Sequence, residues 1–344
     1  SRFNTSHIDL NGKTVSTFGT INSANSSSHH GNTVAGVIAA DIGDGNLVGI
    51  APSVNLHISD YNNITGYTYH PDKWAAATNN ASTAIVQNNS WGVDVQIDTV
   101  QNYINSNGTS VNWTVGAYYD AYSSFNVNTA SIANYISALD NFQSHGVVVY
   151  ALTNDSSFTD ADISAALPIL YPELAEAWLT AANIDIPNAS DLTQNVLKSG
   201  PCGQTAPFCL VSDGWGITGL TDTGYNTNKN GTSFVAPQIS AAVALLSEAF
   251  PNHTPEELTD RLLASANNTW FSHSGETTFG NGIKHGYNTS FGHGLMDIYA
   301  ALNPITSSSS SRTIDYKLSD GTSLNEPVNV SNLRASRSFG DGLF

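Results

Sequence analysis

The sequence predicts an α/β protein with a mostly parallel central sheet and helices on both faces. Short apolar runs bounded by turn residues, at 84–88 and 146–151, are typical of buried strands. Helix-like segments separate these runs, and strands that alternate with helices build a parallel sheet covered on both sides. At 344 residues the chain is long enough for one large domain of this class with an appendage.

Individual elements are predicted from local patterns. Pro251 follows a long apolar segment and marks the end of a helix. Thr254 precedes Pro255, Glu256 and Glu257, which suit the first turn of another helix because a helix N-terminus favours negative charge. The expected elements are helices over 33–40, 131–143 and 235–250, strands over 84–88 and 146–151, and a weaker strand at 210–212.

The chain divides into three parts. Residues 1–304 hold the predicted elements and form one globular domain. A serine run from Ser307 to Ser311 marks 305–311 as a flexible linker. Residues 312–344 mix polar and apolar residues without a helical period, so we expect a small β-like appendage or an extended tail there.

The charge of the chain restricts its partners. The sequence has 11 Lys and Arg against 28 Asp and Glu, which gives a net charge of −17. Nucleic acid is therefore not expected as a partner, because nothing supplies a cationic patch. Such an acidic surface is typical of a secreted protein that stays soluble by like-charge repulsion. No apolar stretch reaches the length that spans a membrane, so this part of the protein is not expected to be membrane-embedded.

Cys202 and Cys209 are the two cysteines of the sequence. An isolated pair indicates one disulfide and an oxidising compartment, and the alternative is two free buried thiols. A zinc site is not expected, because two thiolates do not complete a tetrahedral shell.

Three segments hold residues suited to nucleophilic catalysis. Ser233, in 231–237, precedes a long apolar helix whose N–H groups favour a developing anion, although a serine there is also a common helix cap. His30 opens a helix of small residues and is a natural general base near neutral pH; the alternative is a surface histidine beside His29. Asn154 follows a buried strand, where its amide can donate to an oxyanion or simply form a turn.

These segments together resemble those of the subtilases, the subtilisin-like serine proteases. His30-Gly31 with Val34-Ala35-Gly36 is similar to the histidine box of the family, and 231–237 is similar to its serine box. The catalytic order His, Asn, Ser is also that of the family, and the resemblance covers about residues 5 to 304.

The resemblance implies a subtilisin-like fold and a serine endopeptidase acting on protein or peptide substrates. Ser233 would attack the scissile carbonyl, His30 would take its proton, and Asn154 would help to hold the oxyanion. The family also implies a set of substrate-binding residues, which here are Ser90, Trp91, Gly92, Leu152 and Thr153.

A narrower resemblance, to autotransporter subtilases, lies in the segment from Cys202 to Cys209 and in 167–174 and 291–297. The tail 338–343 resembles the junction at which such proteins meet their linker and outer-membrane barrel. This implies a protein exported to the extracellular or outer-membrane surface of a Gram-negative bacterium, and tethered there through a barrel beyond Phe344.

The aspartate that orients the histidine in this family has no counterpart in the sequence. Asp9 is the one acid before His30, but 6–10 resembles the segment that follows the catalytic aspartate, so we do not assign Asp9 to catalysis. We expect the first strand and its aspartate upstream of Ser1. Three readings stay open: a trimmed part of an intact protease, a processed product whose first strand is lost or held as a separate piece, and an inactive member of the family.

Two further points concern ligands and rival functions. Residues 41–46 offer oxygen ligands for a structural calcium, with an exposed acidic turn as the alternative, and no other cofactor or metal is expected.

The rival to a protease is a catalytically silent surface module for adhesion or assembly. A lipase or esterase is disfavoured because Ser233 lacks a G-x-S-x-G motif.

Overall fold

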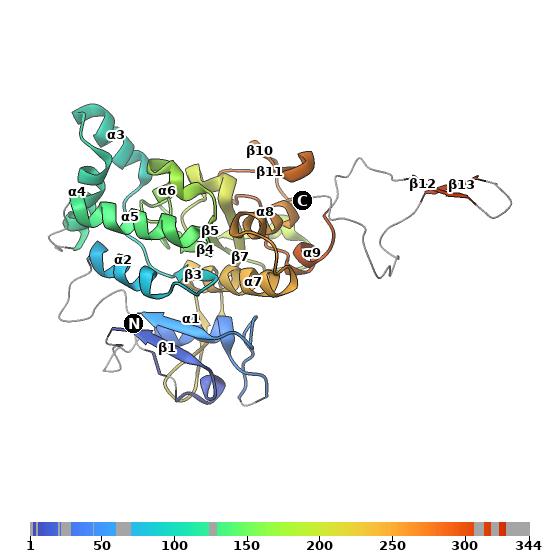
Figure 1. Ribbon diagram of the computed structural model, residues 1–344, viewed down its shortest axis with the longest axis horizontal. Coiled ribbons are helices and arrows are strands. Elements are labelled where there is room, and N and C mark those ends of the chain that lie inside the picture. The colour runs from blue at the N-terminus through green and yellow to red at the C-terminus, as the bar shows by residue number, and fades with distance from the viewer. Residues whose placement is uncertain are drawn as a thin grey trace.

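The computed structural model describes residues 3–4, 6–19, 21, 29–43, 45–59, 70–123, 129–305, 313–317 and 323–327. Figure 1 shows a large body of helices around a sheet, with a smaller part that contains β1 and α1 beside it. Most of the predicted linker 305–311 and the junction motif 338–343 lie outside the described residues.

The central sheet has five strands. β3 (Val86–Asn89), β4 (Val147–Ala151), β5 (Trp178–Asp185) and β7 (Cys209–Asp213) are parallel, and β6 (Val196–Leu197) pairs antiparallel with the end of β5. The predicted α/β class with a mostly parallel sheet is confirmed, and each predicted strand lies within two residues of an observed one.

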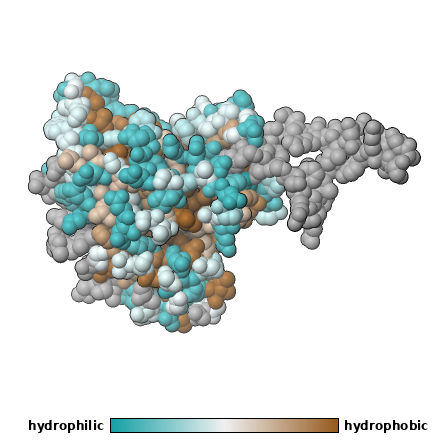
Figure 2. Space-filling view, viewed as in Figure 1, coloured by the Kyte–Doolittle hydropathy of each residue, from teal (hydrophilic) through white to brown (hydrophobic). Residues whose placement is uncertain are grey.

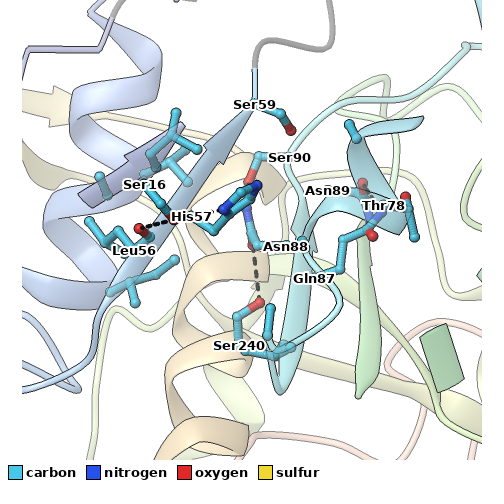
Figure 3. Close-up of a pocket in the computed structure, with 18 of the residues that line it drawn as sticks. Ser16, Leu56, His57, Ser59, Thr78, Gln87, Asn88, Asn89, Ser90 and Ser240 are labelled. Carbon is cyan, nitrogen blue, oxygen red and sulfur yellow. Dashed lines mark hydrogen bonds between the residues drawn. The ribbon is translucent and has the colours of Figure 1, made fainter. Parts of the chain in front are cut away.

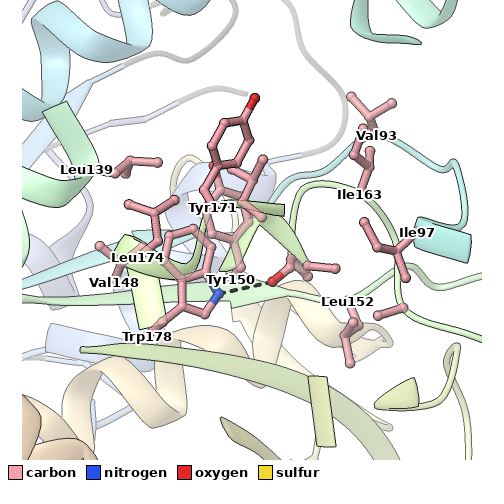
Figure 4. Close-up of a cluster of buried hydrophobic side chains, with 14 of the residues drawn as sticks. Val93, Ile97, Leu139, Val148, Tyr150, Leu152, Ile163, Tyr171, Leu174 and Trp178 are labelled. Carbon is pink, nitrogen blue, oxygen red and sulfur yellow. Dashed lines mark hydrogen bonds between the residues drawn. The ribbon is translucent and has the colours of Figure 1, made fainter. Parts of the chain in front are cut away.

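Helices cover both faces of this sheet, which explains the continuous apolar runs of its strands. Val148 of β4 packs into the hydrophobic cluster of α5 (Thr129–Gln143), whereas its neighbour Val149 packs into that of α7 (Ala236–Ala249). Figure 4 shows the first cluster, in which the rings of Tyr150 and Trp178 stack with centroids 5.1 Å apart.

The other helices are shorter or lie at the periphery. Thr254 caps α8 with a reciprocal pair of hydrogen bonds to Glu257, so the predicted helix start is confirmed. The remaining helices are α1 (His30–Ala39), α2 (Pro71–Asn80), α3 (Ile97–Asn107), α4 (Val111–Ser123), α6 (Leu167–Leu170), α8 (Pro255–Ser265) and α9 (Ile298–Leu302). Within the described part of the chain, no helix has both the length and the apolar character to cross a bilayer.

The remaining strands form two-stranded sheets. β1 (Val15–Phe18) and β2 (Leu56–Ser59) are parallel, and the other three pairs are antiparallel. These pairs are β8 (Ile217–Leu220) with β9 (Tyr225–Lys229), β10 (Gly275–Thr278) with β11 (Lys284–Tyr287), and β12 (Thr313–Lys317) with β13 (Ser323–Pro327). The C-terminal segment thus contains one β-hairpin.

Cys202 and Cys209 form the predicted disulfide across the 3₁₀ segment η4 (Gly203–Phe208), directly before β7. We expect the double substitution Cys202→Ser, Cys209→Ser to lower the free energy of unfolding by about 2–3 kcal/mol, because the bond restricts the unfolded chain. Urea unfolding measures this loss. A reductant should produce the same loss in the unmodified protein and none in the variant; equal stability of the two proteins would contradict the prediction.

Candidate active site

Ser233 lies in a one-turn 3₁₀ helix, η5 (Thr232–Phe234), just before α7. It does not cap α7, whose N-cap is Val235. Ser233 Oγ donates to the carbonyl of Ser90 at 3.3 Å, and Ser90 Oγ donates to the carbonyl of Ser233 at 2.9 Å. The predicted nucleophile and the first predicted substrate-binding residue are therefore in direct contact, although 143 positions separate them.

Asn154 is joined to the same turn through Thr232. Its Oδ1 accepts the Thr232 backbone N–H at 3.0 Å and lies 3.3 Å from the Thr232 hydroxyl, which also donates to the Leu152 carbonyl at 2.6 Å. These bonds fix the amide so that its Nδ2, which donates to no described group, stays available. Gly231 has φ +142, and a Cβ there would lie 2.9 Å from Asn154 Oδ1, so glycine permits this approach.

The predicted substrate-binding residues lie after the carboxyl ends of β3 and β4, as a ligand crevice in a parallel sheet requires. Trp91 packs its ring against Trp74, with centroids 4.6 Å apart, and Gly92 is exposed. The Leu152 side chain is 2% exposed and packs in the hydrophobic cluster of α5 (Figure 4), while Thr153 is 5% exposed.

His30 is the first residue of α1, is half-buried, and forms no hydrogen bond or ion pair with any described residue. Its ring centroid lies 5.8 Å from that of Phe234, next to Ser233 in the chain. Burial, together with nearby positive charges such as that of Lys229, lowers the pKa of His30 from 6.5 to about 4. The ring is thus neutral at pH 7, as a general base must be, but no described carboxylate orients it.

The neighbouring histidine does have a carboxylate partner, which sequence reasoning missed. His29 Nδ1 lies 3.2 Å from Asp222 Oδ1, a residue of the β8–β9 turn. No local pattern links residues 193 positions apart, so the sequence alone offered no signal for this pair.

A cavity of about 600 Å³ separates β2 from β3. Within the described ranges β2 pairs with β1 alone and β3 pairs with β4 alone. Residues of α2 form one wall of the cavity and residues of α1 and α7 form another, so helices enclose the space as they enclose the central sheet. Figure 2 shows apolar residues where the small part of the molecule meets the large one.

The cavity reaches the candidate site. His30 and Ser90 both line it, and Figure 3 shows Ser59, the end of β2, on the same side as Ser90, which follows β3. Two polar atoms of its lining, Nε2 of His57 and Oε1 of Gln87, are buried without a hydrogen-bond partner. Burying a polar group without a hydrogen-bond partner costs free energy, so these two atoms would favour a polar occupant of the cavity.

Asp9 lies at the end of α1 away from His30. The Asp41 backbone N–H, two residues beyond α1, donates to the Asp9 carbonyl at 2.8 Å, and ten residues of helix span about 15 Å. The omission of Asp9 from the catalytic residues is therefore consistent with its position. Asp41 pairs with Lys13, and the described residues hold no group of three His, Cys, Asp or Glu side chains suited to a metal. The suggestion of calcium stays a prediction, because Asp44 lies outside the described residues.

The mostly parallel sheet with helices on both faces places the chain in the class of α/β proteins. The chain belongs to the subtilase family, Peptidase S8, which it matches over residues 1–294. It is thereby a member of a family of serine proteases.

The curated proteins that resemble the chain include the following two. It is 23% identical over 269 residues to the extracellular serine protease of Serratia marcescens, a match that covers 67% of this chain and 24% of that protein. It is 28% identical over 179 residues to serotype-specific antigen 1 of Mannheimia haemolytica, over 50% of this chain and 17% of that protein. The chain thus spans a quarter or less of either relative.

Among solved structures, the serine protease of Aeromonas sobria in complex with its chaperone superposes with a TM-score of 0.61. The superposition covers 88% of this chain and 58% of that one, at 17% identity. At this identity the likeness establishes the subtilisin-like fold.

Proposed function

We propose that the protein is a secreted or cell-surface serine endopeptidase that hydrolyses peptide bonds through an acyl-enzyme. The observation that carries the proposal is the contact network of Ser233, Ser90, Thr232 and Asn154, which presents a hydroxyl and a free amide donor at one edge of the sheet. An amide held through its oxygen, with its N–H₂ free, suits stabilisation of a developing oxyanion.

In this mechanism Ser233 Oγ attacks the scissile carbonyl carbon while His30 accepts the hydroxyl proton. The carbonyl oxygen becomes an oxyanion that accepts from Asn154 Nδ2 and from the Ser233 backbone N–H. His30 then gives its proton to the leaving amine as the C–N bond breaks, and a water molecule hydrolyses the ester with His30 again as base. Ser233 must exchange its bond to Ser90 for one to His30.

Substrate would bind as an extended strand beside 90–92. Gly92 supports this, since its N–H and C=O have no partner among the described residues and its backbone is exposed. Such a strand adds by backbone hydrogen bonds, which accept many sequences.

The carboxylate that orients His30 would come from one further strand, placed in the cavity between β2 and β3. A parallel strand there would satisfy two unpaired sheet edges, and its carboxyl end would emerge beside His30 and Ser90. We place this strand upstream of Ser1, in agreement with the resemblance of 6–10 to the segment that follows the family's catalytic aspartate.

The proposed location is the extracellular or outer surface of a Gram-negative bacterium. The relative from Serratia marcescens is named as extracellular, and the disulfide between Cys202 and Cys209 suits an oxidising compartment.

A phosphonate probe that captures nucleophilic serines tests the proposal. We expect labelling of the full-length protein at Ser233, loss of labelling in Ser233→Ala, and unchanged labelling in Ser247→Ala, a matched serine further along α7. Peptide mapping by mass spectrometry identifies the site. If the full-length protein folds but no phosphonate labels it, the result would support the catalytically silent surface module instead. The observation that favours this alternative is that no described carboxylate orients the His30 ring.

A further inference from the structure

Asp162 is buried behind the predicted substrate-binding residues, with 1% of its surface exposed. Its Oδ2 accepts the Thr153 backbone N–H at 2.9 Å. Its Oδ1 accepts the backbone N–H groups of Ser164 at 3.1 Å and Ala165 at 3.2 Å. The carboxyl thus joins the end of β4, one residue before Asn154, to the turn at 162–165.

The same turn is joined to the segment that follows β3. Ser164 Oγ accepts the Val93 backbone N–H at 3.0 Å, and the backbone of Ile163 donates to Val95 at 2.8 Å. A Cβ on Gly92 would lie 3.2 Å from Asp162 Oδ1, closer than most such contacts. Asp162 therefore fills the space between Gly92 and Thr153, two of the predicted substrate-binding residues.

We infer that Asp162 is a positioning residue for substrate: by holding Thr153 against the turn behind Gly92, it sets the distance between these two predicted substrate-binding residues. That distance would limit the size of the substrate side chain on the acyl side of the scissile bond. The inference rests on the proposed function. A carboxyl is required because both of its oxygens accept from N–H donors, whereas an asparagine has one acceptor oxygen and would direct an N–H₂ group at another donor.

The protonation state of Asp162 supplies a second line of evidence. Burial raises its pKa to about 7, and the charge of Asp94 adds to that rise, while the three N–H donors oppose it. The other titratable groups that interact with it are the hydroxyls of Tyr119 on α4 and Tyr150 on β4, which are neutral at this pH. Protonation near neutral pH converts one acceptor oxygen into a hydroxyl and weakens the hold on Thr153.

The test compares Asp162→Asn with Asp160→Asn in the full-length protein. Asp160 lies in the same loop, but its carboxylate accepts from Gln204 and not from Thr153. For Asp162→Asn we expect KM for peptide substrates to rise about tenfold with kcat within about threefold, as loss of one charge-assisted hydrogen bond implies. The preference for a large over a small acyl-side residue should also weaken, and KM should no longer depend on pH near 7. Asp160→Asn should leave KM, the side-chain preference and the pH dependence of KM unchanged.

Amide hydrogen exchange gives a readout that needs no activity. The Thr153 amide should be protected in the unmodified protein and lose about tenfold of its protection in Asp162→Asn. If that variant does not fold, the unmodified protein still decides, because the protection factor of Thr153 should fall as pH drops below 7. The inference would be overturned if Asp162→Asn cleaved peptides with an unchanged KM, or if the folded variant kept the protection of the Thr153 amide. If the unmodified protein cleaved no peptide but its Thr153 protection still depended on Asp162, the proposed function would be overturned instead.

Discussion

A short extended peptide that ends in aspartate should accelerate phosphonate labelling of Ser233 by about 10⁴-fold relative to the same peptide ending in asparagine. The magnitude is that expected for a carboxylate that fixes the orientation of a catalytic histidine. The peptide needs four or five apolar residues before its acid, because β2 and β3 each have four residues and helices enclose both faces of the cavity. This prediction applies to the chain over 1–344, with the strand added in trans.

The pKa of His30 reports independently whether the aspartate of the peptide binds beside the His30 ring. Without a carboxylate, burial and nearby positive charge hold the pKa of His30 at about 4. A negative charge against the ring stabilises the imidazolium and so raises the pKa. A histidine ring resonance followed over pH by NMR should therefore titrate at higher pH with the aspartate peptide than with the asparagine peptide.

A blocked cavity supplies the control. Ala77 of α2 lines the cavity without contacting Ser233, and Ala77→Trp should fill the space that the peptide needs. Labelling in this variant should be slow and insensitive to either peptide. Equal acceleration by the asparagine peptide, or acceleration that persists in Ala77→Trp, would show that the cavity does not hold a catalytic strand.

The helices and strands that sequence pattern predicted are present, because each depends on neighbours along the chain, whereas β5 and the helices α2 to α4 were not predicted. Apolar runs and the cap at Thr254 are local signals, and the strands and helices follow them within a few residues. The predicted site residues also lie near one another: Ser233 contacts Ser90, and Asn154 contacts Thr232 beside Ser233. Ser90 and Asn154 follow adjacent strands of the central sheet, whereas Ser233 precedes α7.

Leu152 shows a signal that was present but unused. Side chains alternate along a strand, so Val148, Tyr150 and Leu152 share one face. The structure places all three in the cluster of α5. The period of two therefore predicted a core position for the Leu152 side chain, and only its backbone, which accepts from Thr232, faces the site.

Asp162 and Asp222 could not have been found in the same way. Asp162 lies in a polar loop whose composition is that of any exposed turn, and its burial arises because 93–97 packs over it. Asp222 reaches His29 across the small part of the molecule. Such contacts depend on how distant segments pack, which local periodicity does not encode.

Asn154→Asp should lower kcat by more than about 10²–10³-fold, the loss expected for one oxyanion donor, with little change in KM. The substitution is selective because Asn154 uses its two amide atoms for different tasks. Oδ1 accepts from the backbone and hydroxyl of Thr232, whereas Nδ2 has no described partner and would donate to the oxyanion. Aspartate keeps the acceptor, removes the donor and adds a negative charge that repels the developing oxyanion.

The matched variant is Asn154→Ala, which removes both the donor and the bond to Thr232. It should lower kcat by about 10²–10³-fold, less than Asn154→Asp does because it adds no charge. In addition it should lose about 1 kcal/mol in the free energy of unfolding, the typical contribution of one hydrogen bond. Steady-state kinetics and urea unfolding separate the two effects.

If Asn154→Asp retained kcat, the amide would serve only to fix the turn before Ser233, and the oxyanion would have to rely on the backbone N–H of Ser233. If instead both variants raised KM and left kcat intact, Asn154 would contact the substrate equally in the ground and transition states. The split between kcat and stability therefore assigns the two atoms of one side chain to catalysis and to architecture.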